Sequence, residues 1–138
     1  MSDLIERVRQ IYAAFGRGDI NTILENMTDD VSWEFEATKD ISWSGIRHSP
    51  GEAAGFFAGI AAEHENPVLE MTEFFLSADD AVAAFGRYQA TVKVTGIRVD
   101  TPVAHYFKFR DGKIARHMNI INSAAFVEVN RAVSASAH

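Results

Sequence analysis

The stretch His105–Asn122, HYFKFRDGKIARHMNIIN, contains two runs of alternating apolar and polar residues on either side of Asp111-Gly112. Alternation with a period of two is typical of a β-strand with one buried face. An Asp-Gly pair between two such runs is typical of a two-residue type I′ turn. The stretch therefore predicts a β-hairpin, and the register of that hairpin decides which of its polar side chains point into the protein.

The first strand of this hairpin places a histidine among apolar residues. Side chains at every second position share one face of a strand. That rule groups His105 with five other residues, namely Val99, Thr101, Val103, Phe107 and Phe109. We expect this face to form part of the core, so His105 is predicted to point inward.

The inward face of the second strand depends on the turn. If the turn has two residues, Arg110 pairs with Lys113, and the inward side chains are Ile114, Arg116, Met118, Ile120 and Asn122. If Arg110–Gly112 forms a three-residue loop, the faces are exchanged, and His117 and Asn119 point inward. We favour the first register because it places apolar side chains beside Phe107 and Phe109. It also leaves Arg116 on the inner face, where a guanidinium group needs a partner.

Three helices are predicted before most of the strands. Apolar residues recur at helical spacing from Asp3 to Phe15 and again after Asp19 as far as Met27. The third helix is predicted from its N-terminal signals, since Ser49 can cap it and Pro50 suits its first position. Glu52 can complete a capping box, and this helix is expected to run to about Glu63.

The remaining periodicity predicts strands at Val31–Glu36, Leu69–Leu76, Ala81–Thr95, Val99–Arg110 and Lys113–Ile121, separated by turn residues. Helices at the beginning and strands at the end indicate an α+β fold. We expect a cone-shaped domain in which the N-terminal helices pack on a strongly curved, mixed or antiparallel β-sheet. One domain should span residues 1–138, with a tail that frays from about residue 130.

The bulk properties exclude several classes of protein. A net charge of −6 argues against a nucleic-acid partner, which needs a cationic surface. Without cysteine, the chain cannot form disulfides or a zinc-thiolate site. The first residues lack the pattern of a secretory signal, and no apolar run approaches the ~20 residues of a membrane span. We therefore expect a cytoplasmic protein that does not bind membranes.

Four motifs, in this order and spacing, resemble the SnoaL-like branch of the nuclear transport factor 2-like superfamily, which includes ketosteroid isomerase. They span nearly the whole chain: AAFGRGD (13–19), MTDDVSWEF (27–35), SGIRHSPGEAAGFFAGI (44–60) and FKFRDGKIARHMNIINSAA (107–125). The resemblance implies a conical fold with a pocket for a small apolar molecule. It implies cofactor-independent acid-base chemistry such as proton transfer, cyclisation or hydration.

The carboxylates that carry this chemistry in the family are missing here. In ketosteroid isomerases a carboxylate base acts with a tyrosine and a protonated acid. The resemblance matches these three positions to Phe35, Ile11 and His105. The aspartate of the SnoaL-like cyclases matches Asn122, and asparagine cannot serve as a general base. His105 is therefore the candidate catalytic residue, because imidazole can exchange a proton near neutral pH.

The candidate pocket combines aromatic side chains with a few polar groups, as is common for small-molecule sites. The residues predicted to bind substrate are Trp33, Phe35, Tyr88, Met118 and Asn122, with Tyr12 or Phe15 from the first helix and Phe56 or Phe57 from the third. His48 and His117 are predicted to be exposed. No metal site is expected, because no carboxylate accompanies His105 and His117 on either candidate face.

Three functions are compatible with the sequence. The first is a small enzyme that uses His105, and the second is a non-catalytic protein that binds a small apolar ligand in the same cone. The third is a dimerisation module with a filled core, in which His105 is a hydrogen-bonded core residue. Phe85, Tyr106 and Ile121 are predicted on the outer face of the sheet. Because members of this family commonly pair through that face, a homodimer is expected.

Overall fold

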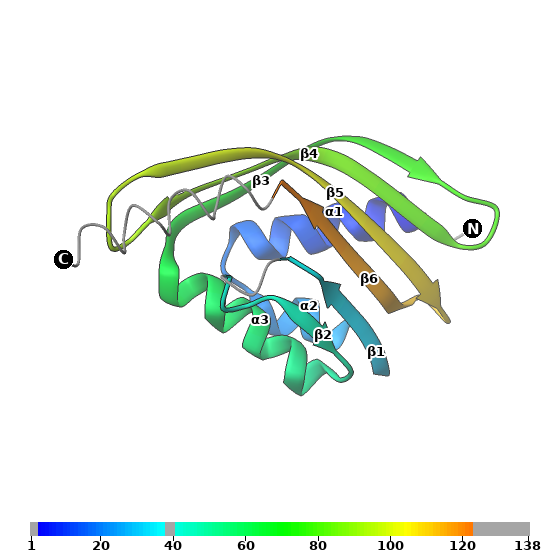
Figure 1. Cartoon of the computed structure of the whole chain (residues 1–138). Helices are drawn as coiled ribbons and strands as arrows, with labels where there is room; N and C mark the ends of the chain where they lie inside the picture. Colours follow the sequence, from blue (N-terminus) through cyan, green and yellow to red (C-terminus); the bar gives the residue numbers. More distant parts are fainter. Residues whose placement is uncertain (1–2, 38–40, 123–138) are drawn as a thin grey trace.

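The computed structural model describes residues 3–37 and 41–122, and its β-sheet arches over the helices (Figure 1). The elements follow one another as α1 (Leu4–Gly16), α2 (Ile20–Glu25), β1 (Met27–Phe35), β2 (Gly45–Arg47), α3 (Pro50–Glu63), β3 (His64–Leu76), β4 (Ala81–Val92), β5 (Arg98–Arg110) and β6 (Lys113–Ile121). The predicted α+β class is confirmed. The tail predicted to fray from about residue 130 lies outside the described residues.

Each helix begins where the sequence supplies a capping side chain. The Asp3 carboxylate accepts a hydrogen bond from the Glu6 amide in α1, and Asp19 does the same for Thr22 in α2. In α3 the Ser49 hydroxyl accepts from the Glu52 amide at 3.1 Å. The Glu52 carboxylate accepts from the amide of His48, one residue before the predicted capping-box position. These bonds satisfy amide groups that have no partner inside the helix.

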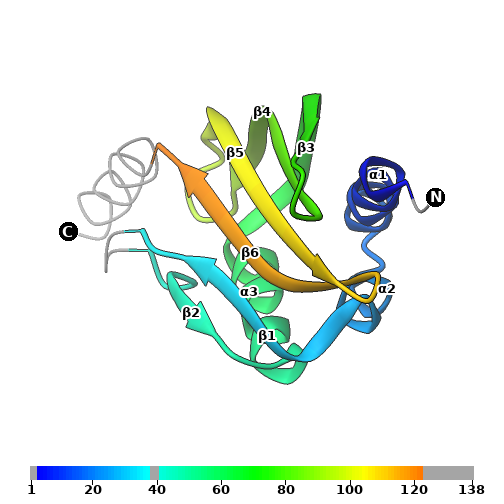
Figure 2. The same ribbon diagram turned by 90° about the vertical axis from the view of Figure 1, so that its right-hand side faces the viewer.

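The six strands form one mixed sheet in the order β2-β1-β6-β5-β4-β3. The β1–β6 pair is parallel, and the other neighbouring pairs are antiparallel. Helix α1 packs against β3 and β4, and α3 packs against β1, β2 and β3. Figure 2 shows the strands curving around α3, with α1 next to β3. The apolar core lies between these helices and the concave face of the sheet.

Strand β3 begins earlier than the sequence indicated, at His64 rather than Leu69. The register of the β3–β4 pair shifts between Glu65 and Val68, and Asn66 has a positive φ of 50°. The strand therefore passes through Asn66-Pro67 as a bulge. Proline is tolerated here because β3 is the edge strand, where one row of amide groups has no partner strand.

The hairpin has the predicted turn followed by a bulge that was not predicted. Asp111 and Gly112 have φ angles of 53° and 78°, as a type I′ turn requires, and Arg110 pairs with Lys113. Phe109 then pairs with Ile114, but Lys108 pairs with Arg116. Ala115 is thus an extra residue in β6. A single extra residue moves every later side chain of the strand to the opposite face.

The predicted inward face of β6 is therefore right at Ile114 and wrong beyond it. Ile114 is fully buried, whereas Arg116 and Asn122 are exposed and Ile120 is 59% exposed. His117 and Asn119 face the concave side together with His105. The bulge also places Arg116 on the outer side of the sheet. There its guanidinium donates hydrogen bonds to both carboxylate oxygens of Glu34, at 2.7 and 3.1 Å.

None of the helices in the described part of the chain combines the length and the apolar character needed to cross a bilayer.

The close approach of β3 to β4 depends on Gly86. A Cβ atom at this position would lie 2.1 Å from the Glu70 carbonyl oxygen and 2.6 Å from the Met71 Cα. We predict that Gly86→Ala lowers the free energy of unfolding by about 1–3 kcal/mol, because backbone atoms must move to relieve the overlap. The measurement is urea denaturation. Gly55→Ala in α3 is the control, since nothing lies within 4 Å of its Cβ position and alanine favours a helix. A Gly86→Ala protein as stable as the wild type would contradict this prediction.

Candidate functional site

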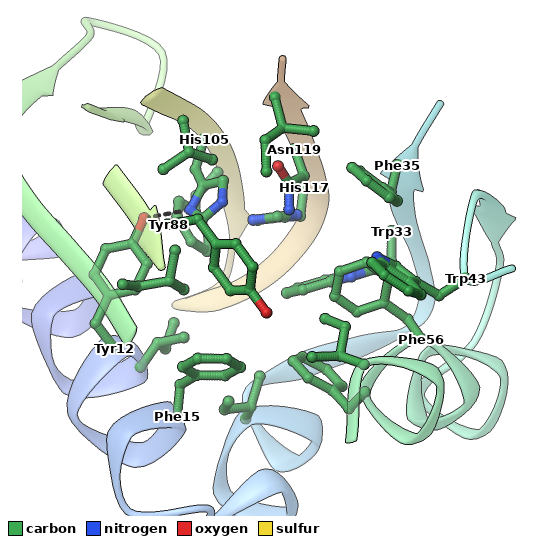
Figure 3. A pocket seen from close by; sticks show the side chains of 18 residues that line it. Tyr12, Phe15, Trp33, Phe35, Trp43, Phe56, Tyr88, His105, His117 and Asn119 are labelled. Atoms are coloured by element: carbon green, nitrogen blue, oxygen red, sulfur yellow. Dashed lines mark hydrogen bonds between the residues drawn. The ribbon is translucent and has the colours of Figure 1, made fainter. Parts of the chain in front are cut away.

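The main pocket lies between the helices and the concave face of the sheet (Figure 3). The centre of a water-sized sphere can move through about 50 Å³ of this pocket. Most of its wall is aromatic, and its polar side chains are Tyr12, Tyr88, His105, His117 and Asn119. No carboxylate is among the described side chains that line it. An aromatic wall with a few polar side chains is the lining common to small-molecule sites.

His105 in β5 and Tyr12 in α1 form the central polar contact of this pocket. The Tyr12 hydroxyl lies 2.7 Å from His105 Nδ1, and the two rings are stacked with centroids 5.7 Å apart. Figure 3 shows this contact as the dashed line between the two side chains. His105 is 5% exposed, so the sheet and the helix shield the pair from bulk water.

Burial keeps both members of this pair neutral. It lowers the pKa of His105 to about 3 and raises the pKa of Tyr12 above its usual value, because each charged form would lose its hydration. The Tyr12 hydroxyl has no other hydrogen-bond partner among the described residues, so we assign it as the donor to Nδ1. The imidazole proton then lies on Nε2. His105 consequently presents a neutral N–H donor from its other ring nitrogen.

The bulge in β6 adds a second imidazole next to the first. His117 is 2% exposed, and its ring centroid lies 5.0 Å from that of His105. It stacks on Trp33 of β1 with centroids 3.9 Å apart and an interplanar angle of 10°. Trp33 and His117 are partners in the β1–β6 register, which explains this stacking. Burial, followed by the nearby His105, lowers the pKa of His117 well below its usual value.

Four buried polar atoms of the pocket wall have no hydrogen-bond partner within residues 3–37 and 41–122. They are Trp33 Nε1, His105 Nε2, His117 Nδ1 and Asn119 Oδ1. Asn119 lies close enough to His105 to oppose the lowering of its pKa, but the two side chains do not meet hydrogen-bond geometry. A buried polar group without a partner costs about 1–3 kcal/mol. Such groups are rare in folded proteins, and water or a bound molecule commonly supplies the missing partner.

A second tyrosine–histidine pair lies on the other side of the pocket. The Tyr88 hydroxyl of β4 is 2.8 Å from Nδ1 of His64, the first residue of β3. Burial lowers the pKa of His64 to about 4 and raises that of Tyr88. The ring of Trp43 packs edge-on against His64 at 4.9 Å. Unlike the His117 and Asn119 atoms, the Tyr88 hydroxyl is therefore already bonded within the protein.

The structure brings together most of the residues that the sequence predicted to bind substrate. Tyr12, Phe15, Trp33, Phe35, Phe56, Phe57, Tyr88 and His105 all line the pocket. Met118 does not, because the bulge turns it toward a separate hollow at the ends of β1 and β6. Asn122 is exposed at the end of β6 for the same reason.

The histidine predictions had mixed outcomes. His48 is exposed, as predicted, whereas the predicted exposure of His117 was wrong. The sequence predicts His117 and Asn119 on the inner face only in the register with the three-residue loop. The signal that could have selected them was Arg116, which the favoured register placed without a partner on the inner face. Among the described residues, no three histidine or acidic side chains are close enough together to hold a metal ion.

A family model for the SnoaL-like domain matches residues 8–117. The chain belongs to the SnoaL-like family. Solved structures with the nuclear transport factor 2-like fold support this assignment. One is a protein of unknown function from Burkholderia pseudomallei, with 22% identity and a TM-score of 0.85, in which the match covers 93% of this chain and 97% of the other.

Two further solved structures are similar to this SnoaL-like protein. TerC, crystallised with polyporic acid, has 27% identity and a TM-score of 0.84, and the match covers 94% of this chain and 99% of TerC. A provisionally assigned polyketide cyclase from Pseudomonas putida has 22% identity and a TM-score of 0.79, with 93% and 98% coverage. A search of the curated proteins gave no significant match.

Proposed function

We propose that this SnoaL-like protein is a cofactor-independent enzyme that moves a proton on a small apolar carbonyl compound. The observation that carries the proposal is the 2.7 Å contact between Tyr12 and His105 inside an aromatic pocket. Enolisation of such a compound is the common first step of double-bond isomerisation and of cyclisation. The provisional cyclase assignment of the Pseudomonas putida neighbour agrees with this class of reaction.

In this mechanism His105 acts as an electrophile. Its Nε2–H group donates a hydrogen bond to the carbonyl oxygen of the substrate, and the Tyr12 hydroxyl, by donating to Nδ1, makes that N–H group more acidic. A preorganised donor of this kind stabilises the negative charge that develops on the oxygen as an enolate forms. A neutral imidazole can polarise a carbonyl group, and burial keeps His105 neutral.

The proton acceptor in the proposal is His117. A neutral imidazole always carries one ring nitrogen with a lone pair, and the His117 ring lies 5.0 Å from that of His105. The proton leaves the carbon next to the carbonyl, its electron pair forms the enolate, and His117 becomes an imidazolium, a charge that burial disfavours and that the adjacent enolate stabilises. The proton then returns to a different carbon, which completes an isomerisation, or it exchanges with solvent before a proton returns. His117 thereby takes the role of the carboxylate that the family has at the position of Phe35 or Asn122, and His105 stands at the position of the protonated acid of the ketosteroid isomerases.

The test is hydrogen exchange on a model ketone, 1-tetralone, in D₂O. We predict that the wild-type protein accelerates exchange of the hydrogens next to the carbonyl, measured by proton NMR, and that His105→Phe slows this exchange by about 100-fold, the lower end of general acid-base effects. Tyr12→Phe should cause a smaller loss, because it leaves the imidazole in place. His48→Phe is the matched control, since it makes the same substitution at an exposed position outside the pocket.

A non-catalytic binding protein is the alternative function. It is favoured by the wall of the pocket, which contains no carboxylate among its described side chains. In that case 1-tetralone would quench the fluorescence of Trp33 and Trp43, but exchange would proceed at the rate of the ketone in buffer alone. Neither quenching nor exchange is expected of a dimerisation module with a filled core.

We also propose that the protein forms a homodimer through the convex face of the sheet. Phe85 pairs with Ala104, and Ala104 pairs with Ile120, so the three side chains form a row across β4, β5 and β6. Phe85 and Ile120 are 43% and 59% exposed, and the Phe75 ring extends the row at 5.9 Å from Phe85. Ile121, predicted on this face, lines the pocket instead because of the bulge, and Ile120 takes its place.

Solution mass tests the dimer. We predict a species of twice the 15.3 kDa chain mass for the wild type, and a 15.3 kDa species for Ile120→Glu, because a charge in the centre of an apolar interface loses its hydration. The control is Val94→Glu, which places the same charge at a 75% exposed residue after β4 and should leave the dimer intact. A wild-type protein that sediments only at 15.3 kDa would remove the proposal.

A further inference from the structure

We infer that the ligand of this pocket carries a hydroxyl group on the carbon next to its carbonyl, and that Asn119 selects for this hydroxyl. The inference rests on the proposed function, since it takes His105 as the group that binds the carbonyl oxygen. It goes further by naming the class of ligand, an α-hydroxy ketone or the corresponding enediol.

One side chain of β5 and one of β6 define this selectivity by their placement. His105 and Asn119 are direct partners across the β5–β6 pair and face the same side of the sheet. In an antiparallel pair, the Cβ atoms of such partners lie about 5 Å apart. His105 Nε2 and Asn119 Oδ1 are both sealed from solvent, and neither has a hydrogen-bond partner among the described residues. Both residues line the pocket, so a ligand bound there can lie next to both atoms.

The two atoms require opposite hydrogen-bonding partners. With Tyr12 donating to Nδ1, His105 Nε2 is a donor, whereas an amide oxygen such as Asn119 Oδ1 can only accept. A ketone oxygen only accepts, so it satisfies His105 and leaves Asn119 without a partner. A hydroxyl on the adjacent carbon supplies the missing donor. A hydroxyl elsewhere on the ligand points away from this pair and does not supply a donor to Asn119.

The other hydroxyl-bearing side chain of the pocket does not provide this selectivity. The Tyr88 hydroxyl is engaged by His64 at 2.8 Å, so a ligand has to compete with an existing hydrogen bond to use it. Asn119 Oδ1 has no hydrogen-bond partner among residues 3–37 and 41–122, and the polar group that acts on it is His105, to which the ligand binds. Binding sites built to bond a hydroxyl reject analogues that lack it, because the polar atom of the protein is then left unpaired in a buried place.

Three bicyclic ketones of nearly equal size test the inference: 1-tetralone, 2-hydroxy-1-tetralone and 4-hydroxy-1-tetralone. Quenching of tryptophan fluorescence gives the dissociation constants. We expect the 2-hydroxy ketone to bind at least ten times more tightly than 1-tetralone, and the 4-hydroxy isomer to gain nothing. In Asn119→Leu the preference for the 2-hydroxy ketone over 1-tetralone should fall to within about twofold, and continued binding of 1-tetralone shows that the pocket is intact.

Equal affinities for the 2-hydroxy and 4-hydroxy isomers in the wild-type protein would overturn the inference, whether or not the variant folds. A preference that persists in Asn119→Leu would overturn the role of Asn119. These outcomes are separate from the proposed catalysis. If 1-tetralone binds and exchanges its hydrogens without any preference, only this inference fails. If the preference is present without exchange, only the catalysis fails. If none of the ketones binds at millimolar concentration, both fail.

Discussion

One extra residue in β6 determines the character of the pocket. Ala115 has no partner in the β5–β6 register, and from that point the side chains of β6 face the opposite side. The concave side receives His117 and Asn119, and the convex side receives Arg116, which forms its ion pair with Glu34. Without the bulge, a guanidinium group would be buried among aromatic rings, where its desolvation would outweigh any local gain. The same shift supplies polar groups to the pocket and removes a charge from it.

A polar cluster in an apolar cavity has consequences for both stability and chemistry. The aromatic wall excludes water, which lowers the pKa of His105 and His117 and keeps both rings neutral. Neutral imidazoles can donate and accept hydrogen bonds without carrying a charge into the core. The orphan atoms Trp33 Nε1 and His117 Nδ1 reduce the stability of the folded protein, since each is buried without a partner. A ligand that supplies partners recovers this free energy, and binding and selectivity then have the same physical origin.

Much of this arrangement could be predicted from the sequence. Capping residues, helical periodicity and turn residues located the three helices and most strands, and alternation from Val99 to Phe109 placed His105 on the inner face. The turn at Asp111-Gly112 was also predicted, because an Asp-Gly pair favours positive φ angles. Each of these features depends on residues that are close together in the chain.

The features that could not be predicted depend on contacts between distant residues. Near Ala115, the sequence signal is Arg116, whose guanidinium would lack a partner on the inner face, and this signal does not locate the extra residue. The bulge forms because Arg116 reaches Glu34, 82 positions away in the chain, and because His117 stacks on Trp33 of the neighbouring parallel strand. Met118 and Asn122 were therefore assigned to the pocket in place of His117 and Asn119. Likewise, the Tyr12–His105 bond joins residues 93 positions apart, and only the packing of α1 against the sheet brings them together.

The claim on which this account depends is that Tyr12 holds His105 as a neutral imidazole with its proton on Nε2. Nitrogen-15 NMR of the histidine side chains measures this directly, because protonated and unprotonated ring nitrogens have widely separated chemical shifts. We expect a protonated Nε2 and an unprotonated Nδ1 for His105 at pH 7. The His105 spectrum should be unchanged at pH 5, since burial lowers the pKa of His105 to about 3. A His105 ring that carries its proton on Nδ1, or that becomes an imidazolium between pH 7 and pH 5, would contradict it.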